Sequence, residues 1–186
     1  ITPHTPATGY GYIEVENRNE GVMDVASFTE KPDPATAQSY LEQGRFFWNS
    51  GIFMVTARAC LESFQALQPD LCILADACWQ TRVVQNDEII LPHPHLQTVP
   101  SISVDYAIME RQSDIALLLF TGAWSDVGSW DSLSSLIETQ TTTPINPDQA
   151  IMVDTRNAFI HSSGRTIAAI GVKDLIIVDD DNATLI

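Results

Sequence analysis

Short apolar runs alternate with segments of helical spacing along the first 138 residues. Strand-like runs rich in β-branched and aromatic residues cover 10–15, 22–29, 51–56 and 115–120. Apolar residues recur at helical spacing in 34–43, 57–67, 71–79, 104–110 and 133–137. The run at 51–56 is continuously apolar, as expected for a strand buried on both faces. Repeated alternation of strand and helix predicts an α/β or α+β layered domain.

The local signals around the first helix are the clearest in the chain. The strand-like runs 10–15 and 22–29 are joined by a polar turn at 17–21, which predicts a hairpin. Asp33 is a suitable N-cap, Pro34 suits the first helical position, and Gly44 can end the helix in the left-handed conformation. Ser103 and Thr56 are candidate caps of later helices.

The pattern changes after the last of these helices. Residues 139–148 contain four threonines and two prolines without apolar periodicity, so we place a boundary there, with domains at 1–143 and 144–186. Beyond it, short β-rich pieces at 151–153, 159–161, 166–170, 175–178 and 183–186 are separated by polar turns. They predict either a meander or the start of a solenoid. Residues 85–100 carry three prolines and are predicted to be loop.

Composition and charge narrow the classes of partner. Nine Lys and Arg against 24 Asp and Glu give a net charge of −15, which argues against nucleic acid and anionic membranes. No apolar run approaches the roughly 20 residues that cross a bilayer, and the start resembles no signal peptide, so we expect a cytoplasmic protein. Cys60, Cys72 and Cys78 show no paired CxxC spacing and are predicted to be reduced, buried thiols.

Two polar clusters flank the first helix at predicted strand ends, where α/β folds bind ligands. Glu30 and Lys31 precede Pro32, and Asn49 lies within a Trp-Asn-Ser-Gly sequence. A local Lys with a divalent cation could hold a phosphate in spite of the acidic chain. Gly9 and Gly11 fail the dinucleotide-binding pattern, because a strand follows and no third glycine is present. They serve either a tight turn or close backbone approach to a ligand.

Other candidates for chemistry have simpler explanations. Asp126, between two tryptophans, can ligate a hard cation such as Mg²⁺ or can cap a turn. His93-Pro94-His95 has no third ligand nearby and is interpreted as exposed loop. The run 179–182, Asp-Asp-Asp-Asn, is interpreted as a solvated turn.

Five motifs in order resemble the mannose-1-phosphate guanylyltransferases, a family of sugar nucleotidyltransferases. They are Thr-Gly-Tyr-Gly-Tyr-Ile at 8–13, Phe-Thr-Glu-Lys-Pro-Asp at 28–33, Trp-Asn-Ser-Gly-Ile-Phe at 48–53, Ser-Val-Asp-Tyr-Ala-Ile-Met-Glu at 103–110 and Trp-Ser-Asp-Val-Gly-Ser-Trp at 124–130. The resemblance implies part of a Rossmann-like nucleotide-diphospho-sugar transferase domain with a mixed sheet. Residues 151–186 are similar to the β-helical tail that follows this domain in the family.

The resemblance implies a reaction in which mannose 1-phosphate and GTP give GDP-mannose and pyrophosphate. It places Tyr10 and Gly11 against the sugar, with Glu30 accepting hydrogen bonds from its hydroxyls and Asn49 contacting it. Lys31 would neutralise the sugar phosphate, and Asp126 would help hold a catalytic Mg²⁺. Each role suits its side chain, since carboxylates accept from hydroxyls and ligate hard cations, and ammonium groups bind phosphate.

One feature of the family is missing from the sequence: no glycine-rich loop with basic residues is present to grip nucleotide phosphates. We therefore expect this chain to be the C-terminal part of the transferase domain plus its tail, with little or no activity alone. Two alternatives remain open. The chemistry could involve another sugar or nucleotide, or the chain could be a non-catalytic sugar-phosphate-binding or assembly module whose β tail supports a homo-oligomer.

Overall fold

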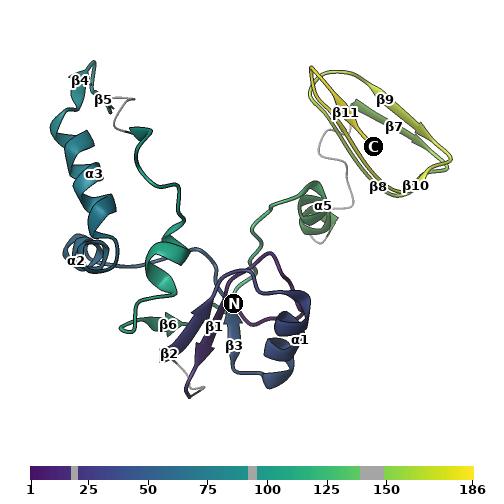
Figure 1. Cartoon of the computed structure of the whole chain (residues 1–186). Helices are drawn as coiled ribbons and strands as arrows, with labels where there is room; N and C mark the ends of the chain where they lie inside the picture. Colours follow the sequence, from purple (N-terminus) through teal and green to yellow (C-terminus); the bar gives the residue numbers. More distant parts are fainter. Residues whose placement is uncertain (18–20, 92–95, 139–148) are drawn as a thin grey trace. The chain divides into compact units, whose positions relative to one another are not determined.

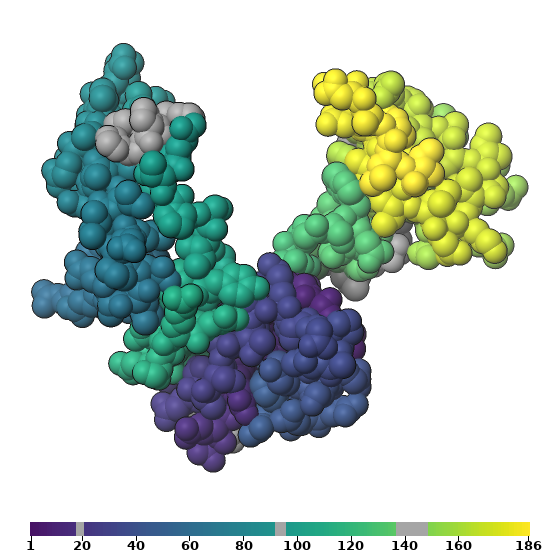
Figure 2. All heavy atoms as spheres, viewed as in Figure 1, coloured from purple at the N-terminus to yellow at the C-terminus, as the bar shows by residue number. Residues whose placement is uncertain are grey.

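The computed structural model describes residues 1–17, 21–91, 96–138 and 149–186 (Figure 1). The chain packs as two units, Ile1–Gly122 and Ala123–Ile186, and each is described by itself. Figure 2 shows the atoms of both units, coloured along the sequence. The predicted boundary between residues 143 and 144 lies outside the described residues. None of the helices in the described ranges is long and apolar enough to span a membrane.

A four-stranded sheet forms the centre of the first unit. Its strands are β3 (Phe46–Trp48), β1 (Tyr12–Val15), β2 (Val22–Thr29) and β6 (Ala116–Leu118), in that spatial order. The predicted hairpin of β1 and β2 is confirmed, although its turn includes 18–20, which the structure does not describe. The sequence predicted a mixed sheet; the three strand pairs of this sheet are antiparallel, and parallel pairs occur in the second unit.

The helix α1 (Pro34–Gln43) forms with the predicted caps and lies beside β3 (Figure 1). Asp33 Oδ1 accepts hydrogen bonds from the backbone N–H groups of Ala35 and Thr36, at 3.0 and 3.1 Å. The Thr36 hydroxyl also donates to Asp33, and these bonds lower the pKa of that carboxyl. Gly44 ends the helix with φ 68°, in the left-handed region. The cap signals therefore determine both ends of α1.

The predicted strand at 51–56 is wrong. The segment pairs with no described strand, and its apolar side chains are exposed: Met54 fully, at 102%, and Ile52 at 78%. β-branched and aromatic residues favour a strand only where a neighbouring strand supplies hydrogen bonds and packing. The segment ends where Thr56 caps α2 (Ala57–Leu67), its hydroxyl accepting from the Ala59 N–H at 3.2 Å.

The helices predicted at 57–67 and 71–79 are confirmed, whereas the loop predicted at 85–100 begins with part of a β-hairpin. Helix α3 (Pro69–Gln80) follows α2 directly, and the three cysteines on these helices are free thiols. Of the three, Cys78 is buried as predicted, whereas Cys60 and Cys72 are partly exposed. Strands β4 (Val83–Gln85) and β5 (Glu88–Ile90) form a hairpin at the start of the predicted loop. Its two turn residues, Asn86 and Asp87, both have positive φ, which matches the twist of a two-residue hairpin. The His-Pro-His sequence at 93–95 lies outside the described residues.

The predicted helix at 103–110 forms as a short π-helix, η1 (Asp105–Met109). The Ser103 hydroxyl accepts from the Tyr106 N–H at 3.4 Å, so this residue stands at the start of the turn as predicted. Ala107 and Ile108 are buried on the unit's core side. The turn is followed by β6, which is shorter than the predicted strand 115–120.

The second unit begins with a loop and α5 (Trp130–Glu138) and continues as β-structure in which two strand pairs are parallel and the last, β10 with β11, is antiparallel. Its strands are β7 (Ala150–Val153), β8 (Arg156–Ser162), β9 (Ile167–Ile170), β10 (Lys173–Asp179) and β11 (Thr184–Leu185). β7 pairs with β9 and β8 with β10, each partner lying 17 residues further along. Residues 154, 157, 171 and 174, at or beside the turns, share a left-handed backbone at the same spacing. Parallel pairing of this kind supports the solenoid and excludes a meander for these strands.

The predicted solvated turn at 179–182 needs a correction. Asp179 is only 5% exposed. Its carboxylate accepts from the Thr184 hydroxyl at 2.6 Å and from the Arg165 guanidinium at 2.6 and 2.9 Å. The bond from Thr184 and the pairing with Arg165 lower the pKa of Asp179. A buried carboxylate is tolerated here because charged and polar donors satisfy it.

Candidate functional site

The ends of β1, β2 and β3 bring the two polar clusters together in the first unit. Tyr12, at the start of β1, stands opposite Thr29 of β2 on one side and Trp48 of β3 on the other. The next residues outward are Gly11, Glu30 and Asn49. The Asn49 N–H donates to the Gly11 carbonyl at 2.8 Å, which continues the ladder by one bond. The sheet therefore places three residues predicted to form a site around one point.

Gly11 has no space for a side chain unless its neighbours shift. A Cβ at this position would come within 2.5 Å of Glu30 Oε2, 3.2 Å of the Phe28 ring and 3.3 Å of Asn49 Cβ. Gly9, by contrast, has open space around it. Close approach, and not a positive φ, is what requires glycine at position 11.

Glu30 and Lys31 form an ion pair at the end of β2. Lys31 Nζ lies 3.2 Å from Glu30 Oε1, with the lysine side chain 58% exposed and the glutamate side chain 8% exposed. Glu30 Oε2 is buried and has no hydrogen-bond partner among the described residues. Lys31 has φ 45°, an uncommon conformation for a residue with a side chain. The pair thus offers one unsatisfied buried acceptor beside one exposed ammonium group.

Asn49 and Glu30 are both held by the η1 turn. Asn49 Nδ2 donates to Asp105 Oδ1 at 3.0 Å, and Asn49 Oδ1 accepts from the Gly51 N–H at 2.9 Å. The Glu30 N–H donates to Glu110 Oε1 at 2.8 Å. Sequence reasoning missed Asp105 and Glu110 as site residues. The signal for them was two carboxylates within one of the five motifs of the resemblance, for which we expected a capped helix and named no site residue.

Tyr10 packs against Trp48. Its ring lies edge-on to Trp48, with the centroids 4.9 Å apart, and His4 packs on the same indole at 4.8 Å. The structure therefore places the Tyr10 side chain in an aromatic cluster, where it supports the entry to β1. A contact between Tyr10 and a ligand stays a prediction.

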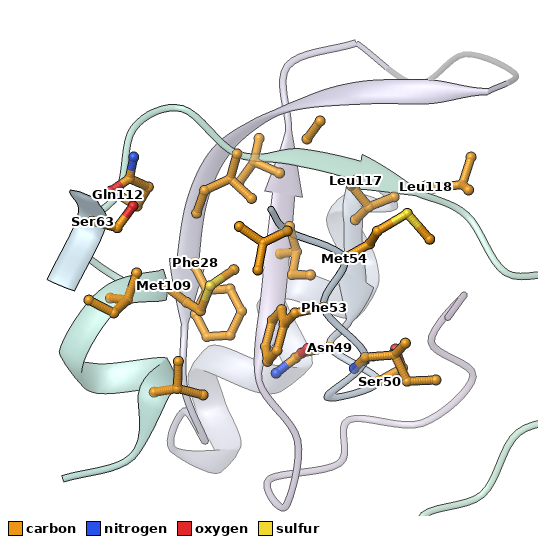
Figure 3. A pocket seen from close by; sticks show the side chains of 18 of the residues that line it. Phe28, Asn49, Ser50, Phe53, Met54, Ser63, Met109, Gln112, Leu117 and Leu118 are labelled. Carbon is orange, nitrogen blue, oxygen red and sulfur yellow. Dashed lines mark hydrogen bonds between the residues drawn. The ribbon is translucent and has the colours of Figure 1, made fainter. Parts of the chain in front are cut away.

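A cleft of about 580 Å³ opens beside the polar cluster and shares Asn49 and Phe28 with it. Figure 3 shows the Asn49 amide close to the Phe53 side chain, with the Phe28 ring beside them and Ser50 near the mouth. The rest of the lining is predominantly apolar and comes from the three strands β1, β2 and β3, from the segment 52–55, and from α2, η1, β6 and the residues just before β6. Polar side chains line the cleft at two places, Asn49 and Ser50 on one side and Ser63 and Gln112 on another, and only the first lies beside Gly11 and Glu30.

Asp126 belongs to the second unit, in the loop before α5. A Cβ at position 128 would come within 2.7 Å of Asp126 Oδ2, so Gly128 leaves room for that carboxylate. Val127 has φ 48°, and its N–H donates to the Ser125 hydroxyl at 3.2 Å. No group of three or more His, Cys, Asp or Glu in the described ranges could hold a metal ion. Binding of Mg²⁺ by Asp126 therefore stays a prediction.

The two parts of the chain match two family models. Residues 1–143 match the nucleotidyl transferase model, and residues 148–186 match the mannose-phosphate isomerase/GMP-like beta-helix domain. The crystal structure of a protein named mannose-1-phosphate geranyltransferase, from Thermus thermophilus, shares the fold. It superposes with a TM-score of 0.80 at 24% identity, covering 99% of this chain and 53% of that one. These matches support an α/β transferase-like unit followed by a β-helix-like tail.

Curated relatives match over the whole chain. The xanthan biosynthesis protein XanB of Xanthomonas campestris pv. campestris is 37% identical, and a mannose-1-phosphate guanylyltransferase of Salmonella montevideo is 34% identical. The chain spans about two fifths of the length of these relatives, 39% and 41%. These coverages lend no support to the prediction that it is the C-terminal portion of the domain, which stays a prediction. The match over residues 1–143 shows that the chain belongs to the nucleotidyl transferase family.

Proposed function

We propose that the site at the ends of β1, β2 and β3 binds mannose 1-phosphate, in a protein that makes GDP-mannose and pyrophosphate from this sugar phosphate and GTP. The buried Glu30 Oε2 carries the proposal, because it has no hydrogen-bond partner among the described residues. An unsatisfied buried acceptor is costly, and a sugar hydroxyl would satisfy it. The names of the relatives point to the same substrate.

Different residues of the site would bind the sugar ring and the phosphate of the ligand. Glu30 Oε2 accepts from a hydroxyl of the sugar, and the Gly11 backbone leaves space for the ring beside it. Asn49 Nδ2 has a second hydrogen beyond the one given to Asp105, and that hydrogen can reach a sugar oxygen. Lys31, exposed and oriented by Glu30, presents its ammonium group to the phosphate. The polar and charged atoms thus match a hydroxylated ring that carries one anionic group.

The reaction requires two anions to meet. A phosphate oxygen of mannose 1-phosphate bonds to the α-phosphorus of GTP, the bond from that phosphorus to the bridging oxygen of the β-phosphate breaks, and pyrophosphate leaves. Lys31 offsets the negative charge of the sugar phosphate and holds it in line for attack. We assign Asp126 as a ligand of Mg²⁺, a cation that stabilises charge on transferring phosphates.

Calorimetric titration of the chain with mannose 1-phosphate tests the proposal. Glu30→Gln keeps the shape of the side chain but removes its charge, and we expect the dissociation constant to rise about 10- to 100-fold, the value of one charged hydrogen bond. Glu62→Gln removes the same charge from an exposed position on α2 and should bind as the wild type does. Equal affinities of the two variants, or no binding by the wild type, would contradict the proposal.

We do not expect the 186-residue chain alone to catalyse the reaction. Without a glycine-rich phosphate-binding loop in the sequence, we expect no GDP-mannose from the 186-residue chain with GTP, Mg²⁺ and mannose 1-phosphate. Chromatographic detection of GDP-mannose measures this, and product formed by the purified chain would show that its nucleotide site lies within these residues.

A further inference from the structure

The motif at 103–110 has no role in the proposed reaction, yet it forms an unusual element at the site. Its central turn is the π-helix η1, in which the Glu110 N–H donates to the Asp105 carbonyl at 3.0 Å. In an α-helix, five residues rotate a side chain about 140° from its starting direction, whereas a π-turn closes its ring over five residues. The π-turn therefore allows carboxylates five positions apart to serve one site.

Each carboxylate of this turn holds a different ligand-binding segment. Asp105 Oδ1 accepts from the Asn49 side chain at 3.0 Å, across 56 residues of sequence. Glu110 Oε1 accepts from the Glu30 backbone at 2.8 Å, across 80 residues. The two segments leave the sheet from different strands, β3 and β2. The Asn49 backbone is tied to Gly11 by one bond beyond the ladder, whereas the Asn49 side chain and the Glu30 N–H bond to carboxylates of the motif at 103–110. One turn of helix joins them.

These bonds decide how the site presents its atoms. A carboxylate can only accept, so Asp105 requires the Asn49 amide nitrogen on its side and leaves the oxygen to the Gly51 N–H. A flipped amide would place oxygen against carboxylate. The bond from Glu30 to Glu110 fixes the backbone directly before Lys31, whose φ of 45° is costly without support.

We propose that Asp105 and Glu110 are positioning residues of the sugar-phosphate site, acting through Asn49 and through the backbone of Glu30 and Lys31. The proposal rests on the proposed function for its ligand. It predicts that the two carboxylates set affinity without contacting the ligand, and that an uncharged acceptor of the same length largely replaces each one.

Paired substitutions test this. Asp105→Ala and Glu110→Ala remove the acceptor, whereas Asp105→Asn and Glu110→Gln keep an oxygen that can accept. For mannose 1-phosphate measured by calorimetry, we expect the dissociation constant to rise about tenfold in Asp105→Ala and about threefold to tenfold in Glu110→Ala, whose bond is exposed. The Asn and Gln variants should regain most of the affinity. Glu62→Ala, on α2, is the matched control and should bind as the wild type does.

A second readout needs no ligand. Amide hydrogen exchange at Glu30 should accelerate in Glu110→Ala and not in Glu110→Gln, and the Asn49 side-chain amide resonances should move in Asp105→Ala while the folded spectrum is kept. Alanine variants with wild-type affinity, or unchanged Glu30 exchange in Glu110→Ala, would overturn the inference. Failure of the wild type to bind mannose 1-phosphate would instead contradict the proposed function, and the exchange data would still decide whether the π-turn holds the two segments.

Discussion

Replacing Gly11 by alanine is the most direct test of how tightly the site is built. The new Cβ would come within 2.5 Å of Glu30 Oε2, a separation that Cβ atoms essentially never show, so one of the two groups must move. The glutamate oxygen ends a flexible side chain and will shift by at least about 0.5 Å, the gap between 2.5 and 3.0 Å. The Phe28 ring and Asn49 Cβ, at 3.2 and 3.3 Å, leave no room for the methyl group to move away.

This geometry separates the effect on stability from the effect on binding. Adding one methyl group to a packed site lowers the unfolding free energy by about 1–3 kcal/mol. Because the Glu30 carboxylate ends a flexible side chain and can shift, we expect Gly11→Ala to cost about 1 kcal/mol, at the lower end of this range. Displacing Glu30 Oε2 should remove its bond to the ligand, worth about 1.5–3 kcal/mol, or about 10- to 100-fold in the dissociation constant for mannose 1-phosphate. The effect on binding should therefore be the larger of the two.

Gly9→Ala is the control, because position 9 lies two residues away and has nothing within 4 Å of a Cβ. Denaturant unfolding measures the stability of both variants, and calorimetry with mannose 1-phosphate measures their affinity. If Gly11→Ala binds as tightly as Gly9→Ala, then Glu30 Oε2 is not the atom that recognises the sugar. A stability loss well above about 3 kcal/mol would show that the carboxylate cannot move as we reason.

Three further predictions concern the framework. Asp179 has a pKa below its ordinary value of 3.8, so the stability that its carboxylate contributes is present above pH 3.8 and is lost as the pH falls further. Acid unfolding followed by circular dichroism should therefore depend less on pH in Asp179→Asn than in the wild type. Equal pH dependence of the two proteins would contradict a stabilising role for the Asp179 carboxylate. Asp33→Ala should lower the unfolding free energy by about 1 kcal/mol through loss of the α1 cap, against little change in Asp24→Ala, at an exposed position of β2. Gly44→Ala should cost about 1 kcal/mol through its left-handed φ, whereas Gly164→Ala, with open space and no positive φ, should cost less.

Local signals predicted the parts of the fold that depend on local chemistry. The ends of α1 follow from Asp33, Pro34 and Gly44, each of which satisfies or terminates the helix through its own backbone or side chain. The hairpin of β1 and β2 follows from two strand-like runs around a polar turn. The position of Glu30 at the end of β2 followed from the same patterns, whereas Asn49 follows β3, a strand that the sequence did not predict. Asn49 was placed at a strand end only through the wrong strand at 51–56.

The predictions that were wrong or missing concern residues whose structure depends on contacts with residues far away in the sequence. Residues 51–56 have the composition of a buried strand, but no described strand pairs with them, so composition misled. Asp179 was interpreted as solvated because Arg165, its ion-pair partner, lies 14 residues earlier in sequence. Asp105 and Glu110 were missed for a similar reason, since their partners are 56 and 80 residues away. The pattern of apolar and polar residues in a short stretch of sequence carries no information on such distant contacts.

The 17-residue spacing of the parallel strands also bears on how this tail can change in evolution. Both ladders, and the left-handed turn residues at 154 and 171, keep the same offset. Loss or gain of a single residue within a coil would move every inward side chain of the following strand to the outer face. Removal or duplication of a whole 17-residue repeat would keep the same pairing between neighbouring repeats, such as that of Ile160 with Ile177. We therefore expect related tails to differ in length by complete coils, with single-residue changes confined to the turns.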